Sequence, residues 1–342
     1  GFKPAIIRDF QSGKWIMTLI SDQKVMFYSS QDLKQWKYES IFEKELKFKD
    51  NIWHKATLFP VGNGNSWVLL VDQEFEDPRE GSAVQYFIGS FDGKSFHNQS
   101  SKPHWLDYGK DNVYNTVCRK SAEDTLPVII GLKNNLDYSL LGDLKSLPGS
   151  MTFPRTVSLT NVYGEMLLSC NPVQALERLV KPGVTIKEIS LENSLDFSNK
   201  INVPISPSII TLKFETTSMT RLSFPAKFGI RLGNEKGEKL EVGFDRFREW
   251  YYIDRSCFAN VKQSYQFGGT QVMQCWHTDS TMVMKMIVDD SSIELFTEDG
   301  KLVMTQNYST QNKLNKLSLF AENGVIKVSA LEIKRLASIW NK

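Results

Sequence analysis

The feature that most constrains the fold is a short pattern that occurs twice in the first half of the chain. Ser30–Trp36 and Ser90–Phe96 both have the form Ser-x-Asp-x-Lys-x-aromatic, 60 residues apart. Each copy follows a pair of β-type runs opened by a tryptophan, Trp15 or Trp67. Repeats of roughly 40 to 60 residues, in which each unit is a small antiparallel sheet, are typical of β-propeller blades. Because similar turns occur at many hairpins, a coincidence of two turns is the alternative.

Short β-type runs follow one another through the first half, and we find no helical stripe between them. Turns rich in Gly, Asn and Asp separate these runs, which predicts an all-β sandwich, barrel or propeller. The repeat favours the propeller, and a third, fainter unit covers residues 126–143. The predicted strands are Trp15–Ile20, Val25–Ser29, Ser66–Val71, Val84–Ser90, Val128–Leu132 and Asp137–Leu141.

The second half alternates apolar and polar residues in many short runs, which predicts a β-sandwich over residues 184–342. Between the halves, Pro172 lies just inside the start of a periodic apolar stretch that Lys181-Pro182-Gly183 would end. We therefore predict a propeller domain of three blades over residues 1–170 and a helical linker over residues 171–183. Acidic residues on the predicted sandwich strands are expected on a solvated face; they are Asp254, Asp289 and Glu294.

The composition excludes several classes of partner. Hydrophobic residues make up 41% of the 342 residues, enough for a core in each of two domains. The net charge of +2 comes from well-mixed charges without a basic stripe, so we expect no nucleic acid partner. No apolar run approaches the roughly 20 residues that span a bilayer, so we expect no membrane segment. The four cysteines form no Cys-x-x-Cys pair, and we predict neither a metal site nor a cofactor.

Six stretches of the first half form an ordered series: Arg8-Asp9, Ser29–Trp36, Ile52-Trp53 with Leu58–Pro60, Tyr86–Phe96, Leu106–Asp111 and Met151–Arg155. In order and spacing, this series resembles the motifs of glycoside hydrolase family 32, the invertase, levanase and inulinase family. The resemblance implies a five-bladed propeller followed by a β-sandwich, and retaining hydrolysis of β-fructofuranosides by two carboxylates. It also implies a fructose-containing saccharide as ligand and an extracellular or periplasmic location.

The resemblance assigns catalytic positions to two residues. Asp9 corresponds to the Asp of the family's Arg-Asp-Pro motif, which holds sugar hydroxyls and stabilises the transition state, although Phe10 replaces the proline. His54 stands where the family has its acid/base glutamate. A histidine can in principle protonate a leaving oxygen, but its reach and geometry differ from those of a glutamate.

Other positions of the family's sugar site are partly kept. The family motif Gly-Trp-x-x-Asn-Trp-x-Tyr corresponds to Gly131–Tyr138, with leucine at both tryptophan positions. The family's nucleophile lies in an Asn-Asp-Pro-Asn stretch upstream of the Arg-Asp motif, and the 342 residues do not contain that stretch. The resemblance assigns substrate binding to Arg8, Trp53, Asp107, Tyr108, Asn135 and Tyr138.

We therefore predict a family 32 protein that is related to β-fructosidases acting on fructans or sucrose-like saccharides, with impaired catalysis in the chain as given. Three alternatives stay open: an enzyme completed by an upstream segment or another chain, a non-catalytic saccharide-binding relative, and a structural or interaction module. Three blades leave open sheet edges, which predicts a homodimer or a covering upstream segment.

Overall fold

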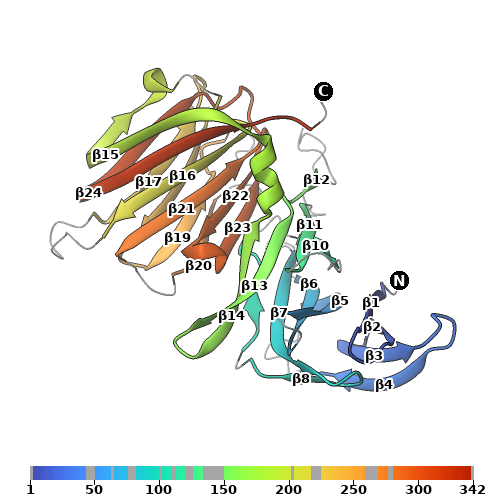
Figure 1. The fold of residues 1–342 in the computed structure, drawn as a ribbon. Helices are drawn as coiled ribbons and strands as arrows, with labels where there is room; N and C mark the ends of the chain where they lie inside the picture. Colours follow the sequence, from blue (N-terminus) through green and yellow to red (C-terminus); the bar gives the residue numbers. More distant parts are fainter. Residues whose placement is uncertain are drawn as a thin grey trace. The chain divides into compact units, whose positions relative to one another are not determined.

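The computed structural model describes residues 3–43, 51–62, 65–75, 82–100, 102–109, 113–119, 126–133, 150–201, 204–216, 225–258, 269–275 and 280–339. The chain divides into two compact units (Figure 1). The first comprises Gly1–Asp137 and Pro148–Val173, and the second Tyr138–Leu147 and Gln174–Lys342. Within the described ranges, no helix has the length and apolar character needed to cross a membrane.

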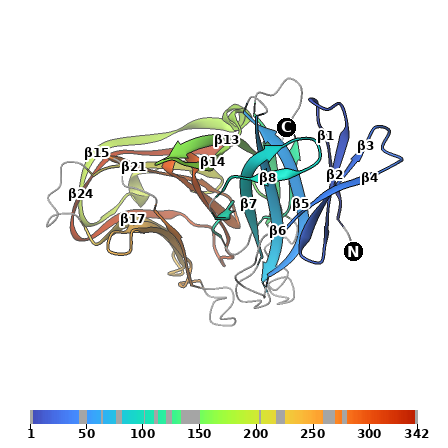
Figure 2. The same ribbon diagram turned by 90° about the horizontal axis from the view of Figure 1, so that it is seen from below.

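Within its described residues, the first unit contains three antiparallel sheets, which are blades of a propeller (Figure 2). Sheet A has the order β1 (Ala5–Arg8), β2 (Trp15–Ser21), β3 (Lys24–Ser30) and β4 (Lys37–Phe42). Sheet B has β5 (Asn51–Val61), β6 (Ser66–Phe75), β7 (Ser82–Phe91) and β8 (Phe96–Asn98), with β9 (His104–Trp105) paired to β7. Sheet C has β10 (Val113–Arg119), β11 (Val128–Lys133), β13 (Arg155–Val162) and β14 (Glu165–Pro172), with β12 (Ser150–Met151) paired to β11.

The repeated sequence pattern forms the same turn in sheets A and B, between the third and fourth strands. Oδ1 of Asp32 accepts the backbone N–H groups two and three residues further on, at 2.8 and 2.9 Å. Oδ1 of Asp92 accepts the equivalent pair at 2.9 and 2.7 Å. In both turns the N–H three residues on makes the largest contribution to lowering the carboxyl pKa, because it favours the charged form. The repeat therefore specifies a turn held by a carboxylate.

Sheets A and B share one hydrophobic core. Phe27 of β3 and Trp67 of β6 both contact the ring of Phe91, at centroid distances of 5.6 and 5.2 Å. The Thr18 hydroxyl donates to the Ala56 carbonyl at 2.6 Å within this core. On its other face sheet B meets sheet C, where Tyr86 accepts a hydrogen bond from a β14 backbone N–H at 3.3 Å. Sheet B is thus covered on both faces.

The second unit is a β-sandwich formed from one folded sheet. Its order is β20-β19-β18-β17-β24-β16-β21-β22-β23, with β15 paired to β24. The long strand β24 pairs with β17 through residues 316–322 and with β16 through residues 327–335, so it belongs to both layers. The strands are β15 (Val180–Asp196), β16 (Ser208–Glu215), β17 (Lys227–Gly233), β18 (Lys239–Asp245), β19 (Trp250–Asp254), β20 (Thr270–Gln274), β21 (Thr281–Val288), β22 (Ser292–Thr297), β23 (Leu302–Asn307) and β24 (Lys316–Leu336).

The segment predicted as a helical linker, residues 171–183, is divided between strand and a short 3-10 helix. Its helical part is a single 3-10 helix, Gln174–Leu179, and β15 begins directly after it at Val180. Pro172 does not open a helix but ends β14, where it pairs with Arg155. Proline is tolerated there because β14 is an edge strand of sheet C.

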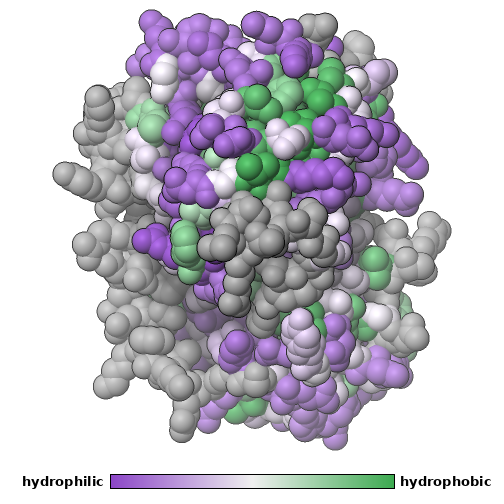
Figure 3. Space-filling view, turned by 90° about the vertical axis from the view of Figure 1, so that its left-hand side faces the viewer, coloured by the Kyte–Doolittle hydropathy of each residue, from purple (hydrophilic) through white to green (hydrophobic). Residues whose placement is uncertain are grey.

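The acidic residues of the sandwich do not all face solvent as predicted. Asp254 and Asp289 are half-buried, and Glu294 is 0% exposed. Every residue of β22 and of β23 is buried. Neither strand therefore has a solvent-exposed face, so an alternation of polar and apolar residues does not mark one there. Figure 3, which views the side carrying β15 and β24, shows mainly hydrophilic residues around a smaller hydrophobic group.

Candidate functional site

Strand β7 runs along sheet B, and the candidate residues lie near one or the other of its two ends. At its start, Val84 pairs with Asp72, and Asp72 pairs with Lys55, next to His54. Just beyond its end, a Cβ added to Gly93 would lie 3.8 Å from Oδ2 of Asp9. A strand rises about 3.3 Å per residue, so these two places are about 25 Å apart. We call them the His54 end and the Asp9 end.

Asp9 uses its carboxylate in the turn between β1 and β2. The side chain is 4% exposed, and Oδ1 accepts the Gln11 N–H at 3.1 Å. Oδ2 accepts the Ser12 N–H at 3.3 Å and also the Ser12 hydroxyl. The preceding Arg8 places its guanidinium 5.1 Å from the centre of the Trp15 ring. Both members of the Arg-Asp pair are therefore engaged in local structure at the Asp9 end.

His54 is the extra residue of a β-bulge in β5. Trp53 pairs with Gln73 and Lys55 pairs with Asp72, which leaves His54 between two consecutive partners of β6. Bulges bend a strand and re-aim a side chain, and they are frequent next to active sites. The His54 side chain is half-buried, whereas Trp53 is 3% exposed and packs in the core between sheets A and B. Trp53 thus contributes to packing, and the bulge sets the direction of His54.

Asp107 lies at the His54 end, in a buried ion pair. The N–H of the preceding Leu106 donates to the Val84 carbonyl at 2.8 Å, near the start of β7. The Asp107 carboxylate binds Arg155 at 2.9 Å and accepts the Gly109 N–H at 3.0 Å, and both charged side chains are at most 2% exposed. Burial raises the pKa of the nearby Cys170 thiol to about 12, with Arg155 acting against the rise and Asp107 with it.

The remaining predicted residues fall into two groups. Tyr108 follows Asp107 and is half-buried. Asn135 and Tyr138 lie outside the described residues. Of the predicted site, the structure brings Trp53, His54, Asp107 and Tyr108 to one end of the blades, and it leaves Arg8 and Asp9 at the other.

Sequence reasoning missed two polar residues at the His54 end. Gln73 is 0% exposed opposite Trp53, and neither its amide oxygen nor its amide nitrogen has a hydrogen-bond partner in the described part of the chain. The indole nitrogen of Trp53 is also buried without such a partner there. Asp72, beside Gln73, is 3% exposed. The signal was present, since two consecutive polar residues at the end of an apolar strand must place one of them on a buried face.

Comparison with known proteins covers both units. Residues 3–170 match the model of the glycosyl hydrolases family 32 N-terminal domain, and residues 175–335 match that of the glycosyl hydrolases family 32 C terminal. The chain belongs to glycosyl hydrolases family 32.

Curated relatives in family 32 are longer than this chain. The levanase of Bacillus subtilis is 28% identical over 339 residues, which are 96% of this chain and 49% of the levanase. Invertase 2 of Saccharomyces cerevisiae is 28% identical over 341 residues, which are 90% of this chain and 63% of the invertase. The chain thus spans about half the length of the Bacillus levanase.

Solved structures share the fold across almost the whole chain. The exo-inulinase of Aspergillus awamori has a TM-score of 0.84 at 22% identity, covering 99% of this chain and 68% of its own. A fructofuranosidase variant of Schwanniomyces occidentalis, complexed with fructosylnystose, has a TM-score of 0.83 at 21% identity, covering 98% and 70%. These family 32 structures combine a propeller with a β-sandwich, as this chain does.

Proposed function

We propose that this chain binds a fructose-containing saccharide at the His54 end of its propeller unit, and that its own residues do not hydrolyse the saccharide. The observation that carries the proposal is the pair His54-Lys55 in a bulge of β5, where the family motif has its acid/base glutamate. A basic pair cannot provide the second carboxylate of a retaining mechanism.

The placement of the candidate carboxylates supports impaired hydrolysis. Retaining glycosidases need two carboxyl groups about 5 to 5.5 Å apart. Asp9 and Asp107 are about 25 Å apart along β7, by the strand rise used above. Asp107 also neutralises Arg155 in the interior, and removing one partner of a buried pair leaves an uncompensated charge. Neither carboxylate is therefore arranged to attack a sugar or to protonate a leaving group.

Polar groups at the His54 end support binding. Saccharide sites combine a few convergent polar groups with aromatic surface. Lys55 and Asp72 are cross-strand partners there, and His54 is the bulged residue beside them. Gln73 shares the core-facing side of Trp53, and Tyr108 follows at the level of the same strands. The relatives' names, levanase, exo-inulinase and invertase, support fructans and sucrose as the ligand class. Two of these relatives are called extracellular, which supports a location outside the cytoplasm.

Two measurements on the purified 342-residue chain test the proposal. We expect no release of fructose from sucrose, levan or inulin, and saturable binding of levan or inulin oligosaccharides in calorimetry. His54→Ala should weaken binding at least 10-fold. The matched control is His97→Ala, because His97 is exposed and borders the Asp92 turn at the Asp9 end. Its affinity should equal that of the parent chain.

Three outcomes would contradict the proposal. Fructose release that Asp9→Ala abolishes would establish an enzyme with a different pair of carboxylates. Fructose release by His54→Glu would mean that only the acid had been lost. Absence of saccharide binding in a folded chain would favour the structural or interaction module.

A further inference from the structure

Gln73 is a polar exception on an apolar face of sheet B. Side chains alternate along a strand, so Gln73 of β6 shares its face with Trp67, Leu69 and Val71. Those three residues belong to the hydrophobic core between sheets A and B. The Gln73 side chain is 0% exposed, so its amide lies inside the same core. Departures of this kind from the local pattern are expected at functional sites.

The cross-strand partner of Gln73 is Trp53 of β5, which adds a second polar group. Opposite residues on one face of an antiparallel pair have Cβ atoms about 4.5 to 5.5 Å apart, so the two side chains start side by side. Both amide atoms of Gln73 and Nε1 of Trp53 are buried without a hydrogen-bond partner in the described part of the chain. Together they offer one carbonyl acceptor and three N–H donors.

The hydrogen-bonding groups of Gln73 and Trp53 match two neighbouring hydroxyl groups. A hydroxyl both donates and accepts a hydrogen bond. One hydroxyl can donate to Oε1 of Gln73 while its neighbour accepts from Nε2, because the two amide atoms are attached to the same carbon. The Trp53 indole N–H can then donate to either hydroxyl. Native proteins leave few buried polar groups unpaired, since each one costs free energy, so these atoms indicate a bound partner.

Contacts around Trp53 hold this pair of side chains in place. The backbone N–H of Trp53 donates to Oε1 of Gln23 at 2.8 Å, which connects β5 to the turn between β2 and β3 of sheet A. The Trp53 ring also packs against Phe87, with 6.4 Å between the ring centroids. A ligand that binds preorganised side chains has less conformational entropy to overcome.

We propose that Gln73 and the Trp53 indole bind a pair of neighbouring hydroxyl groups at the His54 end. Two sources supply this chemistry: two adjacent buried waters, or a vicinal diol of a saccharide, which carries hydroxyls on neighbouring carbons. The saccharide source rests on the function proposed above, and the water source does not. His54 follows Trp53 directly at the bulge, so the pair lies next to the place where the saccharide is proposed to bind.

Nuclear magnetic resonance of the indole groups tests the proposal on the complete ¹⁵N-labelled chain. The chain has eight tryptophans, and Trp53→Phe identifies the Trp53 signal. A water source should give a nuclear Overhauser contact between the Trp53 indole proton and water, which persists when inulin oligosaccharide saturates the chain. A saccharide source should shift the Trp53 signal on saturation and remove any water contact.

Gln73→Met distinguishes a bound hydroxyl pair from an amide that is simply unsatisfied, because methionine has a similar length and no amide. With waters bound, the variant should lower the thermal midpoint by roughly 2 to 4 °C, as the net loss of one hydrogen bond does in a domain of this size. With a saccharide bound, it should weaken oligosaccharide affinity about 10-fold. The matched control is Gln85→Met, on the same face opposite Val71 and 9% exposed, which should change neither quantity.

Two results would overturn the proposal. The first is a Trp53 indole signal with neither a water contact nor a shift on addition of oligosaccharide. The second is a higher thermal midpoint for Gln73→Met together with unchanged oligosaccharide affinity, because the amide would then be unsatisfied and unused. If calorimetry detects no saccharide binding, the function proposed above fails, but the water contact at Trp53 still decides this inference.

Discussion

Two sheet faces, one in each unit, both reach the solvent but are chemically opposite. The face of sheet A turned away from sheet B, which we call the Met17 face, carries Ile6, Met17, Leu19, Met26, Tyr28, Tyr38 and Ile41. Its marginal residues are 43 to 49% exposed, and all are apolar or tyrosine. The outer face of β17, β18 and β19 exposes 41% of Lys227 and 26% of Arg231. This charged face is stable in water because Lys227, Arg231 and Lys239 each pair with an acidic residue of the same face. The exposed fraction alone therefore does not distinguish a solvated surface from an interaction surface. The presence of paired polar groups does.

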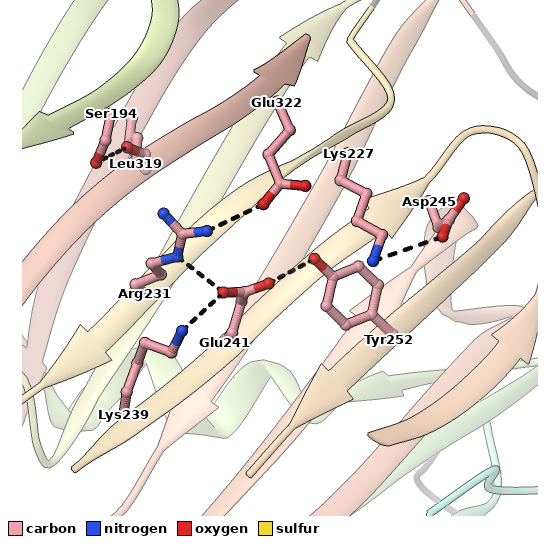
Figure 4. A network of polar contacts seen from close by, with 9 residues as sticks. All are labelled: Ser194, Lys227, Arg231, Lys239, Glu241, Asp245, Tyr252, Leu319 and Glu322. Atoms are coloured by element: carbon pink, nitrogen blue, oxygen red, sulfur yellow. Dashed lines mark hydrogen bonds and ion pairs between the residues drawn. The ribbon is translucent and has the colours of Figure 1, made fainter. Parts of the chain in front are cut away.

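The charged face of the sandwich is centred on Glu241 (Figure 4). Its carboxylate accepts the Arg231 guanidinium at 2.8 Å and the Tyr252 hydroxyl at 2.8 Å, and Lys239 lies 3.3 Å away. Burial by itself would raise the pKa of Glu241, but the hydrogen bonds from Arg231 and Tyr252 outweigh it and lower the pKa. Arg231 also reaches Glu322 at 3.3 Å.

Removing Glu241 should break the charged face and produce the largest effect. Glu241→Ala leaves the buried Tyr252 hydroxyl and the Arg231 guanidinium without their acceptor, which costs about 2 to 3 kcal/mol of unfolding free energy. Urea denaturation measures this loss. Glu322→Ala is the control, because this carboxylate is 45% exposed and surface pairs contribute about 0 to 1 kcal/mol. Equal losses would mean that Glu241 does not organise the face.

The contribution of Glu241 to the unfolding free energy should also depend on pH. The folded pKa of Glu241 is lowered, so its contribution is fully present above the unfolded pKa of about 4.3. That contribution is lost as the pH falls through the lower folded pKa. Glu241→Gln should therefore be less stable than the parent chain at pH 6, and the gap should narrow towards pH 3. Denaturation curves at intervals between these values test it, and a constant gap would contradict the assignment.

The repeated turns allow the comparison to be made within the first unit. Asp32→Ala in sheet A and Asp92→Ala in sheet B remove the same pair of backbone hydrogen bonds. Each variant should show a small and similar fall in the thermal midpoint, because the turns are equivalent. Gln35→Ala, which keeps the Asp32 bonds, is the control. A much larger fall for one turn would show that the two copies are not equivalent.

The smallest effect is expected on the Met17 face itself. Ile41→Thr in the isolated chain should change the unfolding free energy by no more than about 0.5 kcal/mol, since substitutions at exposed positions away from special features stay within that range. Urea denaturation again provides the measurement. A loss above 1 kcal/mol would mean that this face is already packed in the isolated chain.

Much of the fold could be predicted from local patterns. The predicted runs Trp15–Ile20, Val25–Ser29 and Val128–Leu132 lie within β2, β3 and β11. The repeated Ser-x-Asp-x-Lys pattern indicated two equivalent units because a carboxylate turn has the same local geometry wherever it occurs. Strands β15 and β24 were not anticipated at their full length, because each bends where it passes from one layer to the other, with Asn193 and Asn323 at positive φ.

The candidate site was less predictable than the fold. Motif order along the chain places Arg8-Asp9 ahead of Trp53-His54, but it does not say at which end of its strand each motif lies. That depends on strand direction and pairing, and here a motif at the end of β1 is separated from one near the start of β5. Glu294 illustrates a related limit, because alternation reveals two faces of a strand without showing whether both are covered.

The two-layer strand β24 also determines when the sandwich can fold during synthesis. Sheets A, B and C are built from hairpins whose partners are close in sequence, so they can form while the ribosome is still translating the second unit. The sandwich must wait for residues 316–336, because β17 and β16 each lack one of their two neighbouring strands until β24 has emerged. At about 5 to 20 residues per second, the second unit remains open for roughly 10 to 30 s. During that interval the incomplete layers of the sandwich expose apolar surface and unpaired strand edges, the features that make folding intermediates prone to aggregation.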